Sequence, residues 1–220
     1  MLRTMFKTCL LAMAMLPSIA HGEPIGFRDF TPGVLPPGFT IAKTGKGQSA
    51  VWEIQESTDA GGGSVVVQTA ADRTDYRYPL LLHDKTLAVD LDVSVKFKTI
   101  SGSIDQAAGI VWRYQDANNY YVVRANALEH NVVAYKVQNG TRSSLGIKGN
   151  SWAYGTSAPV AKGIWHVLAV TARGDTFAIS LDGKKLYDVT DKTFPDAGKV
   201  GLWTKADSVT MFDALDVVVK

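Results

Sequence analysis

Cysteine is almost absent from this sequence, which has a single copy at position 9. Cys9 falls within an N-terminal segment that has the features of a cleaved export signal, so we expect the mature chain to contain no cysteine. A chain without cysteine has no disulfides, no thiol nucleophile and no cysteine-ligated metal. The hydrophobic core must therefore hold the fold together without covalent cross-links.

The sequence also lacks an apolar run long enough to cross a membrane. Arg3 and Lys7 precede the apolar residues 9–16, and small residues then permit cleavage before Glu23. The apolar run is far shorter than the ~20 residues that a transmembrane helix needs. We therefore expect residues 1–22 to be a signal peptide and the mature protein to be periplasmic or secreted, with no membrane insertion after cleavage.

No excess of charge of one sign is present. The 220 residues include 23 Lys and Arg against 21 Asp and Glu, and the signal peptide holds two of the basic residues. The mature chain of 198 residues is thus formally neutral, which gives no support for nucleic acid or an anionic membrane as a partner. Its length fits one domain. We expect that domain over residues 23–220, with the proline- and glycine-rich residues 23–38 as an extended N-terminal arm.

A sustained helical period is missing throughout. Short β-branched and aromatic runs such as residues 50–55, 64–69 and 176–181 are instead separated by turn residues. Asn139-Gly140 and Asp182-Gly183 are typical of two-residue hairpin turns, because both positions accept positive φ angles. Roughly a dozen short strands with turns between them predict an all-β sandwich or barrel.

The region around residues 87–138 has two distinguishable faces. Side chains alternate across a strand, so parity assigns each residue to a face. A hairpin that pairs Arg113 with Tyr120 places Trp112 on the apolar face, and residues 90–98 continue this face as a third strand. We expect Trp112 to be buried between two sheets. Its expected neighbours are Phe97, Ile110, Tyr121 and Val123.

The opposite face of these strands collects polar side chains and is the candidate ligand-binding surface. Two planar guanidinium groups, an aromatic ring and an amide are groups that recognise sugars, by paired hydrogen bonds and by stacking on an apolar C–H face. Mixed charges on an outward face are also ordinary solvation, and that alternative stays open. The residues expected to contact a ligand are Arg113, Tyr120, Arg124, Asn126 and Lys136.

Residues 108–121, with the sequence AGIVWRYQDANNYY, resemble the central hairpin of bacterial concanavalin A-like domains. These include laminin-G-like and 3-keto-disaccharide hydrolase-like domains. Trp165 with its alternating apolar successors, the turn at Asp182-Gly183 and residues 198–203 resemble later strands of the same domains, so the resemblance covers residues 87–218. It implies a two-sheet antiparallel jelly-roll sandwich of the concanavalin A-like type. That fold hosts lectins, hydrolases, lyases and adhesive modules alike.

Catalytic motifs of that group are missing. Retaining glucanases of glycoside hydrolase family 16 carry Glu-x-Asp-x-(x)-Glu along one strand, and this sequence does not. The Asn-Gly-Lys entry turn of the 3-keto-disaccharide hydrolase-like domains is missing too. Asp90 and Asp92 are expected to be ion-pair partners of Arg113 rather than a catalytic pair. Glu129 and His130, at the end of a strand, are candidates for an acid and a base, or else are solvated turn residues.

Metal-binding patterns are equally sparse. No two histidines stand at ligand spacing, so we expect no metal and no cofactor. Concanavalin A-like lectins and laminin-G-like modules often bind Ca²⁺ through loop carboxylates, and Asp105, Asp116 and Asp182 leave such a site open without forming a motif.

These observations favour an exported, lectin-like domain that binds an oligo- or polysaccharide on the polar face of one sheet. A glycosidase, or a keto-glycoside hydrolase or lyase, that uses the same groove is the first alternative. A protein-binding scaffold or adhesive module is the second. The sequence leaves open whether the chain is an enzyme.

Overall fold

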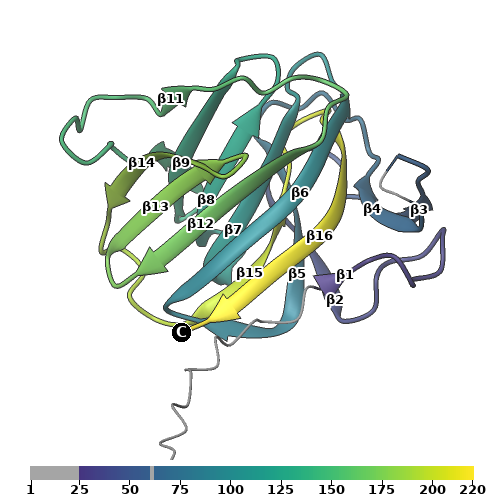
Figure 1. The fold of residues 1–220 in the computed structure, drawn as a ribbon, viewed down its shortest axis with the longest axis horizontal. Coiled ribbons are helices and arrows are strands. Elements are labelled where there is room, and N and C mark those ends of the chain that lie inside the picture. The colour runs from purple at the N-terminus through teal and green to yellow at the C-terminus, as the bar shows by residue number, and fades with distance from the viewer. Residues whose placement is uncertain (1–24, 60–61) are drawn as a thin grey trace, which may run out of the picture.

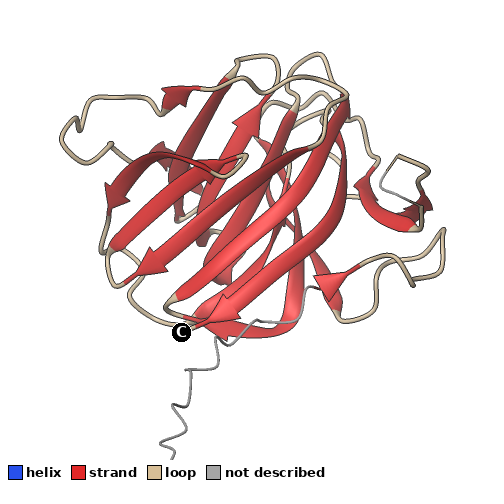
Figure 2. Ribbon diagram, viewed as in Figure 1, coloured by secondary structure: helices blue, strands red, loops and turns tan. Residues whose placement is uncertain are grey.

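A computed structural model describes residues 25–59 and 62–220, whose strands form two antiparallel sheets that face each other (Figures 1 and 2). This confirms the predicted all-β sandwich. The predicted signal peptide, with Cys9, lies outside the described residues. Among the described residues there is no helix long and apolar enough to cross a membrane.

Sheet A, which faces the viewer in Figure 1, has the strand order β14-β13-β12-β6-β16-β4-β3, and β1 pairs with β16. The short strand β1 lies in the segment predicted as an N-terminal arm. The bounds of this sheet are β1 (Ile25–Gly26), β3 (Trp52–Glu56), β4 (Ser64–Gln68), β6 (Leu91–Ser101), β12 (His166–Arg173), β13 (Thr176–Leu181), β14 (Lys184–Thr190) and β16 (Val209–Val219).

Sheet B lies behind sheet A and has the order β10-β9-β8-β7-β15-β5-β2, with β11 paired to β9. Its bounds are β2 (Phe39–Gly45), β5 (Arg77–Ala88), β7 (Ala107–Asp116), β8 (Asn119–Asn126), β9 (Asn131–Gln138), β10 (Thr141–Ser144), β11 (Thr156–Ser157) and β15 (Gly198–Trp203).

Two hairpin turns form where the sequence predicts them. Asn139 and Gly140 join β9 to β10 with φ angles of 52° and 75°. Asp182 and Gly183 join β13 to β14 with φ angles of 50° and 76°. Positive φ at both central residues gives the turn the twist that matches its flanking strands.

The main core lies between the two sheets, and Trp112 is fully buried in it. Its ring stacks on Tyr121 at 5.4 Å between centroids and meets Phe177 of sheet A edge-on at 5.3 Å. The same core contains Phe97, Ile110 and Val123. The predicted burial of Trp112 between the sheets and its contact with Tyr121 are confirmed.

The placement of residues 90–98 differs from the prediction. They were expected beside β7 in one sheet, but β6 pairs with β12 and β16 in sheet A, whereas β7 pairs with β8 in sheet B. Both strands turn their apolar sides to the same core. Parity therefore identified the inward residues of β6 correctly but could not say to which sheet the strand belongs.

Sheet B is strongly curled, so its face away from sheet A is concave. Thr44 Oγ1 of β2 lies 2.8 Å from Tyr120 Oη of β8, although four strand spacings, about 19 Å in a flat sheet, separate these strands. Arg142 of β10 reaches the ring of Tyr78 on β5 in the same way. The concave face holds a second buried apolar cluster, formed by Tyr78, Leu80, Leu82, Ala107, Val111, Tyr120, Val122, Val133, Tyr135, Val137 and Trp203.

Candidate functional site

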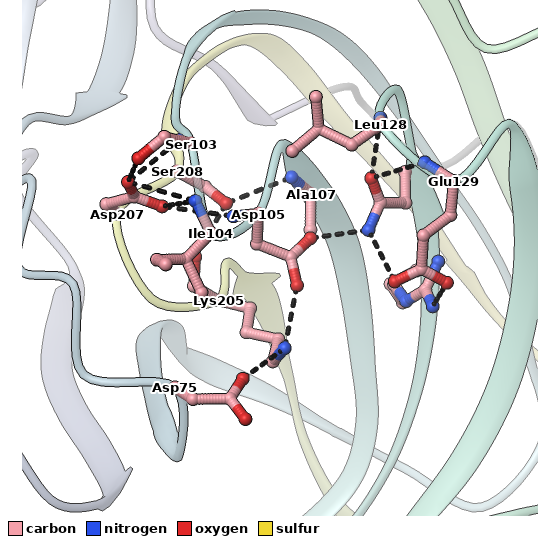
Figure 3. Close-up of polar contacts among 12 residues, drawn as sticks. Asp75, Ser103, Ile104, Asp105, Ala107, Leu128, Glu129, Lys205, Asp207 and Ser208 are labelled. Atoms are coloured by element: carbon pink, nitrogen blue, oxygen red, sulfur yellow. Dashed lines mark hydrogen bonds and ion pairs between the residues drawn. The ribbon is translucent and has the colours of Figure 1, made fainter.

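Polar side chains form a continuous row across one end of the concave face, which we call the polar row. It begins at Asp75, just before β5, whose carboxylate accepts a hydrogen bond from Lys205 Nζ at 2.6 Å. The same Nζ lies 2.9 Å from Asp105 Oδ2 (Figure 3). Lys205 follows β15 and Asp105 precedes β7, so one ammonium group links three neighbouring strands.

The polar row continues across β8 to the β8–β9 turn. Asn126 Nδ2 donates to Asp105 and, at 3.1 Å, to Glu129 Oε1. Arg124 Nη2 donates to Glu129 Oε2 at 2.7 Å, and Arg124 Nη1 donates to Asn131 Oδ1. Every charge in this segment therefore has an opposite charge or an amide beside it.

Local backbone interactions fix the carboxylates of the polar row in place. Asp207 accepts hydrogen bonds from the backbone N–H groups of Ser103, Ile104 and Asp105 and so holds the loop before β7 (Figure 3). Asn126 Oδ1 accepts hydrogen bonds from the N–H groups of Leu128 and Glu129 (Figure 3), which positions Glu129 in the β8–β9 turn. Such side-chain to backbone bonds are typical of Asp and Asn in turns.

Burial and charge shift the pKa values of the polar row in opposite directions. Burial raises the pKa of Asp105 above its usual value, even though Lys205 opposes this shift. Burial also acts to raise the pKa of Glu129, but the charge and hydrogen bond of Arg124 outweigh it and lower that pKa. Burial would lower the pKa of Lys205, yet its bonds to Asp105 and Asp75 raise it.

Exposed tyrosines stand at both ends of the polar row. Tyr76, next to Asp75, is 68% exposed, and Tyr154 is 53% exposed. Tyr154 Oη lies 3.4 Å from Arg124 Nη2 and 2.6 Å from Tyr135 Oη. The carboxylate side chain of Glu129 is 42% exposed and that of Asp75 is 57% exposed. Both carboxylates are thus open to a ligand, with the Tyr154 ring beside Arg124 at one end of the row and Tyr76 next to Asp75 in the chain at the other.

Three of the predicted site residues, Arg124, Asn126 and Glu129, lie together in the polar row. The expectation that they stand on an open, solvated face is wrong for Arg124 and Asn126, because each is 1% exposed. They reach the surface through their partners. Their role in ligand binding stays a prediction.

Arg113 is not part of the polar row. A β-bulge interrupts the pairing of β7 and β8 after Trp112 and Tyr121, and Arg113 adopts a φ of 47° there. The bulge turns its guanidinium to the core side, 5.2 Å from the centre of the Phe177 ring. The predicted pairing of Arg113 with Tyr120 is therefore wrong, although the pairing one residue earlier is confirmed.

The ion-pair partners expected for Arg113 are partly correct. Asp90 lies 3.6 Å from Arg113 Nη2. Asp92 instead pairs with Arg173 at 2.8 Å on the outer face of sheet A, because β6 belongs to that sheet.

Tyr120 and Lys136 are also placed differently from the prediction. Tyr120 is on the concave face, but it is fully buried against Thr44, and burial raises its pKa. Lys136 lies opposite Tyr121 and so faces the other side of the sheet, where its Nζ is 3.0 Å from Asp191. The prediction continued the side-chain alternation of β8 through the turn into β9. The turn shifts this alternation by one residue, so Lys136 faces the same side as Tyr121.

His130 and Glu129 do not converge on a common partner. His130 has a φ of 49°, and its Nδ1 lies 3.0 Å from the carbonyl oxygen of Val160. Glu129 pairs with Arg124. The carboxyl group that shares a hydrogen-bond partner with Glu129 is Asp105, through Asn126 Nδ2.

No protein-family model and no curated protein matches the chain, but solved structures do. The carbohydrate-binding module CBM66 from Bacillus subtilis is similar with a TM-score of 0.63 and 20% identity, over 82% of this chain and 94% of that one. A Bacillus subtilis protein with a galectin-like fold has a TM-score of 0.53 and 11% identity, over 83% of this chain and 90% of that one. The exoplasmic/lumenal domain of VIP36, in its Ca²⁺- and mannose-bound form, has a TM-score of 0.55 and 11% identity, over 91% of this chain and 90% of that one. The chain has a galectin-like, concanavalin A-like β-sandwich fold.

Sequence reasoning missed several members of this site on the β-sandwich. Loops contain Lys205, Asp75 and Tyr154, and the alternation of side chains that identifies strand faces does not extend to loops. These residues join the polar row only because the strands bring loops from distant parts of the sequence together. Arg142 also escaped notice, although it projects over the concave face from the edge strand β10.

The described residues contain no group of three or more His, Cys, Asp or Glu side chains placed to hold a metal ion. The three carboxylates considered for Ca²⁺ are engaged separately. Asp105 pairs with Lys205, Asp116 accepts from Asn118 and Asn119, and Asp182 accepts from His166 and the N–H of Val167.

Proposed function

We propose that this protein binds a glycan at the polar row, with no chemical change to the sugar. One observation carries the proposal: the polar row exposes two carboxylates and has an exposed tyrosine at each end, Tyr154 beside Arg124 and Tyr76 next to Asp75 in the chain. Glu129 and Asp75 offer exposed carboxylate oxygens that accept from sugar hydroxyls, and each carboxylate pairs with a cation of the row. Tyr76 and Tyr154 offer rings on which an apolar C–H face stacks.

The similar structures support this proposal without deciding it. One of them is a carbohydrate-binding module and another is a lumenal domain with bound mannose. A shared sandwich does not transfer a ligand, since function depends on the site rather than on the fold. The polar row supplies the site in this chain.

A second candidate function is glycoside hydrolysis, favoured by the two carboxyl groups that share Asn126. Asp105 and Glu129 both accept from Asn126 Nδ2, and their pKa values shift in opposite directions. Two carboxyl groups whose surroundings separate their pKa values are the usual pattern of an acid paired with a nucleophile or base. Asp105 is only 1% exposed, however, so binding without hydrolysis is the function that the geometry supports better.

A glycan array with parallel measurement of released reducing ends tests both functions. We expect binding and no release. Isothermal titration of a responding glycan should then show that Glu129→Gln weakens binding about tenfold or more, the scale of a lost charge-assisted hydrogen bond. Tyr76→Ala, which leaves every ion pair intact, should weaken it by about three- to tenfold through lost stacking.

Asp92→Asn is the matched control, since it alters a half-exposed carboxylate–arginine pair on the opposite sheet. Its affinity should equal that of the parent. Equal affinity of Glu129→Gln, Tyr76→Ala and the control would remove the polar row from the binding site. Release of reducing ends that stops in Glu129→Gln would replace binding by hydrolysis.

A further inference from the structure

Arg142 occupies an unusual position on the concave face of sheet B. It lies on the edge strand β10, and its guanidinium carbon is 4.3 Å from the ring centre of Tyr135, 4.9 Å from that of Tyr78 and 5.8 Å from that of Trp203. Three aromatic rings from β9, β5 and β15 thus surround one half-buried cation. Cation–π attraction is strengthened where water is excluded.

This cation has no counter-ion among the described residues. Lys205 has Asp75 and Asp105, and Arg124 has Glu129, but no carboxylate of the described chain lies within 4.0 Å of Arg142. Its Nη1 is buried and makes no hydrogen bond. A buried donor without an acceptor is unfavourable, and more so when the group is charged.

A second unmet donor lies close by. Arg124 Nε is buried without a hydrogen-bond acceptor, and the guanidinium carbon of Arg124 is 5.8 Å from the centre of the same Tyr135 ring. Two buried guanidinium donors without acceptors therefore flank one tyrosine. Both therefore have N–H groups that a hydrogen-bond acceptor could satisfy.

We propose that Arg142, assisted by Arg124, binds an oxyanion substituent on the glycan, which makes the ligand an acidic saccharide with carboxylate or sulfate groups. This inference rests on the proposed function. A guanidinium that stacks on rings keeps its in-plane N–H groups free, and their fork matches the oxygens of a carboxylate or sulfate. A neutral hydroxyl would satisfy the donor, but only an oxyanion also balances the unpaired charge.

Each acidic residue of the polar row lies beside a cation of that row. Asp75 and Asp105 share Lys205, and Glu129 pairs with Arg124. These three carboxylates and two cations leave the polar row with one formal negative charge in excess, whereas Arg142 has no carboxylate within 4.0 Å among the described residues. The ligand should therefore place its hydroxyls on the polar row and its oxyanion over the ring cluster of Tyr78, Tyr135 and Trp203.

Isothermal titration with two matched pairs of polymers tests the inference. Polygalacturonate and its methyl ester differ only in the carboxylate charge, and dextran sulfate and dextran differ only in the sulfate. We expect at least one charged polymer to bind about tenfold or more tightly than its neutral partner. In Arg142→Gln this ratio should fall to about one while the affinity for the neutral polymer stays unchanged. The pair that responds identifies the oxyanion.

Two further variants separate binding from a structural role of Arg142. Arg142→Met keeps a long side chain over the rings without charge, so its thermal midpoint should stay near that of the parent while the preference for the charged polymer is lost. Arg173→Gln, on the outer face of sheet A, removes a half-exposed arginine and should keep that preference.

Equal loss of the preference in Arg142→Gln and Arg173→Gln would indicate general attraction to polyanions and would overturn the inference. Equal binding of charged and neutral polymers would also overturn it and would leave glycan binding intact. If neither charged polymer binds, the inference falls, and the glycan array then decides the proposed function separately.

Discussion

Three arginines, Arg77, Arg113 and Arg124, are almost fully buried in the described residues, and their partners distinguish two roles. Arg77 donates to the backbone carbonyl groups of Gln48, Ser49, Ala70 and Ala206. Arg113 likewise donates to three backbone carbonyl groups. Arg124 instead donates to side chains that reach the surface. The first two fasten loops through backbone carbonyl groups, and Arg124 is the one of the three that joins the polar row.

At the same scale, Asp72 predicts a measurable pH dependence. Its carboxylate accepts hydrogen bonds from the N–H of Gln48 and from the N–H and hydroxyl of Thr74, which lower its pKa from 3.8 to about 2. A carboxyl group with a depressed pKa in the folded state stabilises that state above the unfolded pKa, and the contribution is lost as pH falls through the folded value.

We therefore expect the wild type to lose stability between about pH 4 and pH 2 more steeply than Asp72→Asn, as measured by urea unfolding at each pH. The difference between the two proteins isolates this group from the other carboxylates. Parallel pH profiles for the two proteins would show that the loop bonds of Asp72 do not favour its charged form.

At the scale of strands, the bulge at Arg113 determines which side chains face the concave surface. Trp112 and Tyr121 pair in register, but the ladder resumes only at Asp116 and Asn119. One consequence is that Tyr114 joins Tyr120 on the concave face, with ring centres 5.8 Å apart. A bulge inserts an unpaired residue and reverses the parity beyond it, so alternation alone could not place Arg113 or Tyr114.

The bulge gives Arg113 a structural role that a mutation can reveal. Its Nε and Nη1 donate to Val89 and Phe194 carbonyl oxygens at 2.9 Å each, and it is 1% exposed. Arg113→Ala should destabilise the fold by about 3 kcal/mol or more, because several buried carbonyl groups lose their donors. Glycan affinity of the folded protein should not change.

Arg173→Ala is the matched comparison, since its side chain is 42% exposed and its ion pair with Asp92 lies at the surface. That variant should lose no more than about 1 kcal/mol in urea unfolding. Arg173 also donates to the carbonyl oxygens of Leu91 and Ala172, so similar losses for the two arginines would show that burial of the carbonyl bonds of Arg113 adds little to stability.

Sequence patterns within a few residues predicted the strands well. Features that depend on residues far apart in the sequence could not be predicted from such patterns. The turns at Asn139 and Asp182 depend on two residues each, and the burial of Trp112 depends on alternation within one strand. The sheet to which β6 belongs depends on pairing with β12 and β16, which are far away in the sequence. The polar row has the same non-local origin, because it joins Asp75, Asp105 and Lys205 across three strands. Arg124, Asn126 and Glu129 were predictable because one hairpin contains them all.

At the scale of the whole molecule, the two outer faces of the sandwich differ in kind. The outer face of sheet A carries half-exposed ion pairs such as Asp92 with Arg173. The curled sheet B closes its concave face over a second apolar cluster and leaves the polar row at one end of it. Because the sheet is curled, Thr44 and Arg142 on its two edge strands contact residues of inner strands, Tyr120 and Trp203 respectively. The site therefore depends on the whole sheet rather than on one hairpin.

We propose, finally, that the protein is exported and reaches its mature form without any thiol. The N-terminal basic residues, the apolar residues 9–16 and the small residues before Glu23 support cleavage there or two residues earlier, at His21. Cleavage at either position removes Cys9, the single cysteine of the chain. Because the two sheets bury a shared core that includes Trp112 and Phe177, the mature sandwich should need no disulfide to stay folded.

Intact-mass measurement of the protein recovered from the periplasm or medium should thus show an N-terminus at Glu23 or His21, and thiol titration under denaturing conditions should give no signal. The urea midpoint should be the same with and without a reducing agent, since no disulfide exists to be broken. A Cys9→Ser variant of the full-length chain should yield a mature protein of identical mass to that from the parent. A mass that retains Cys9, or a midpoint that falls on reduction, would contradict export with cleavage at this position.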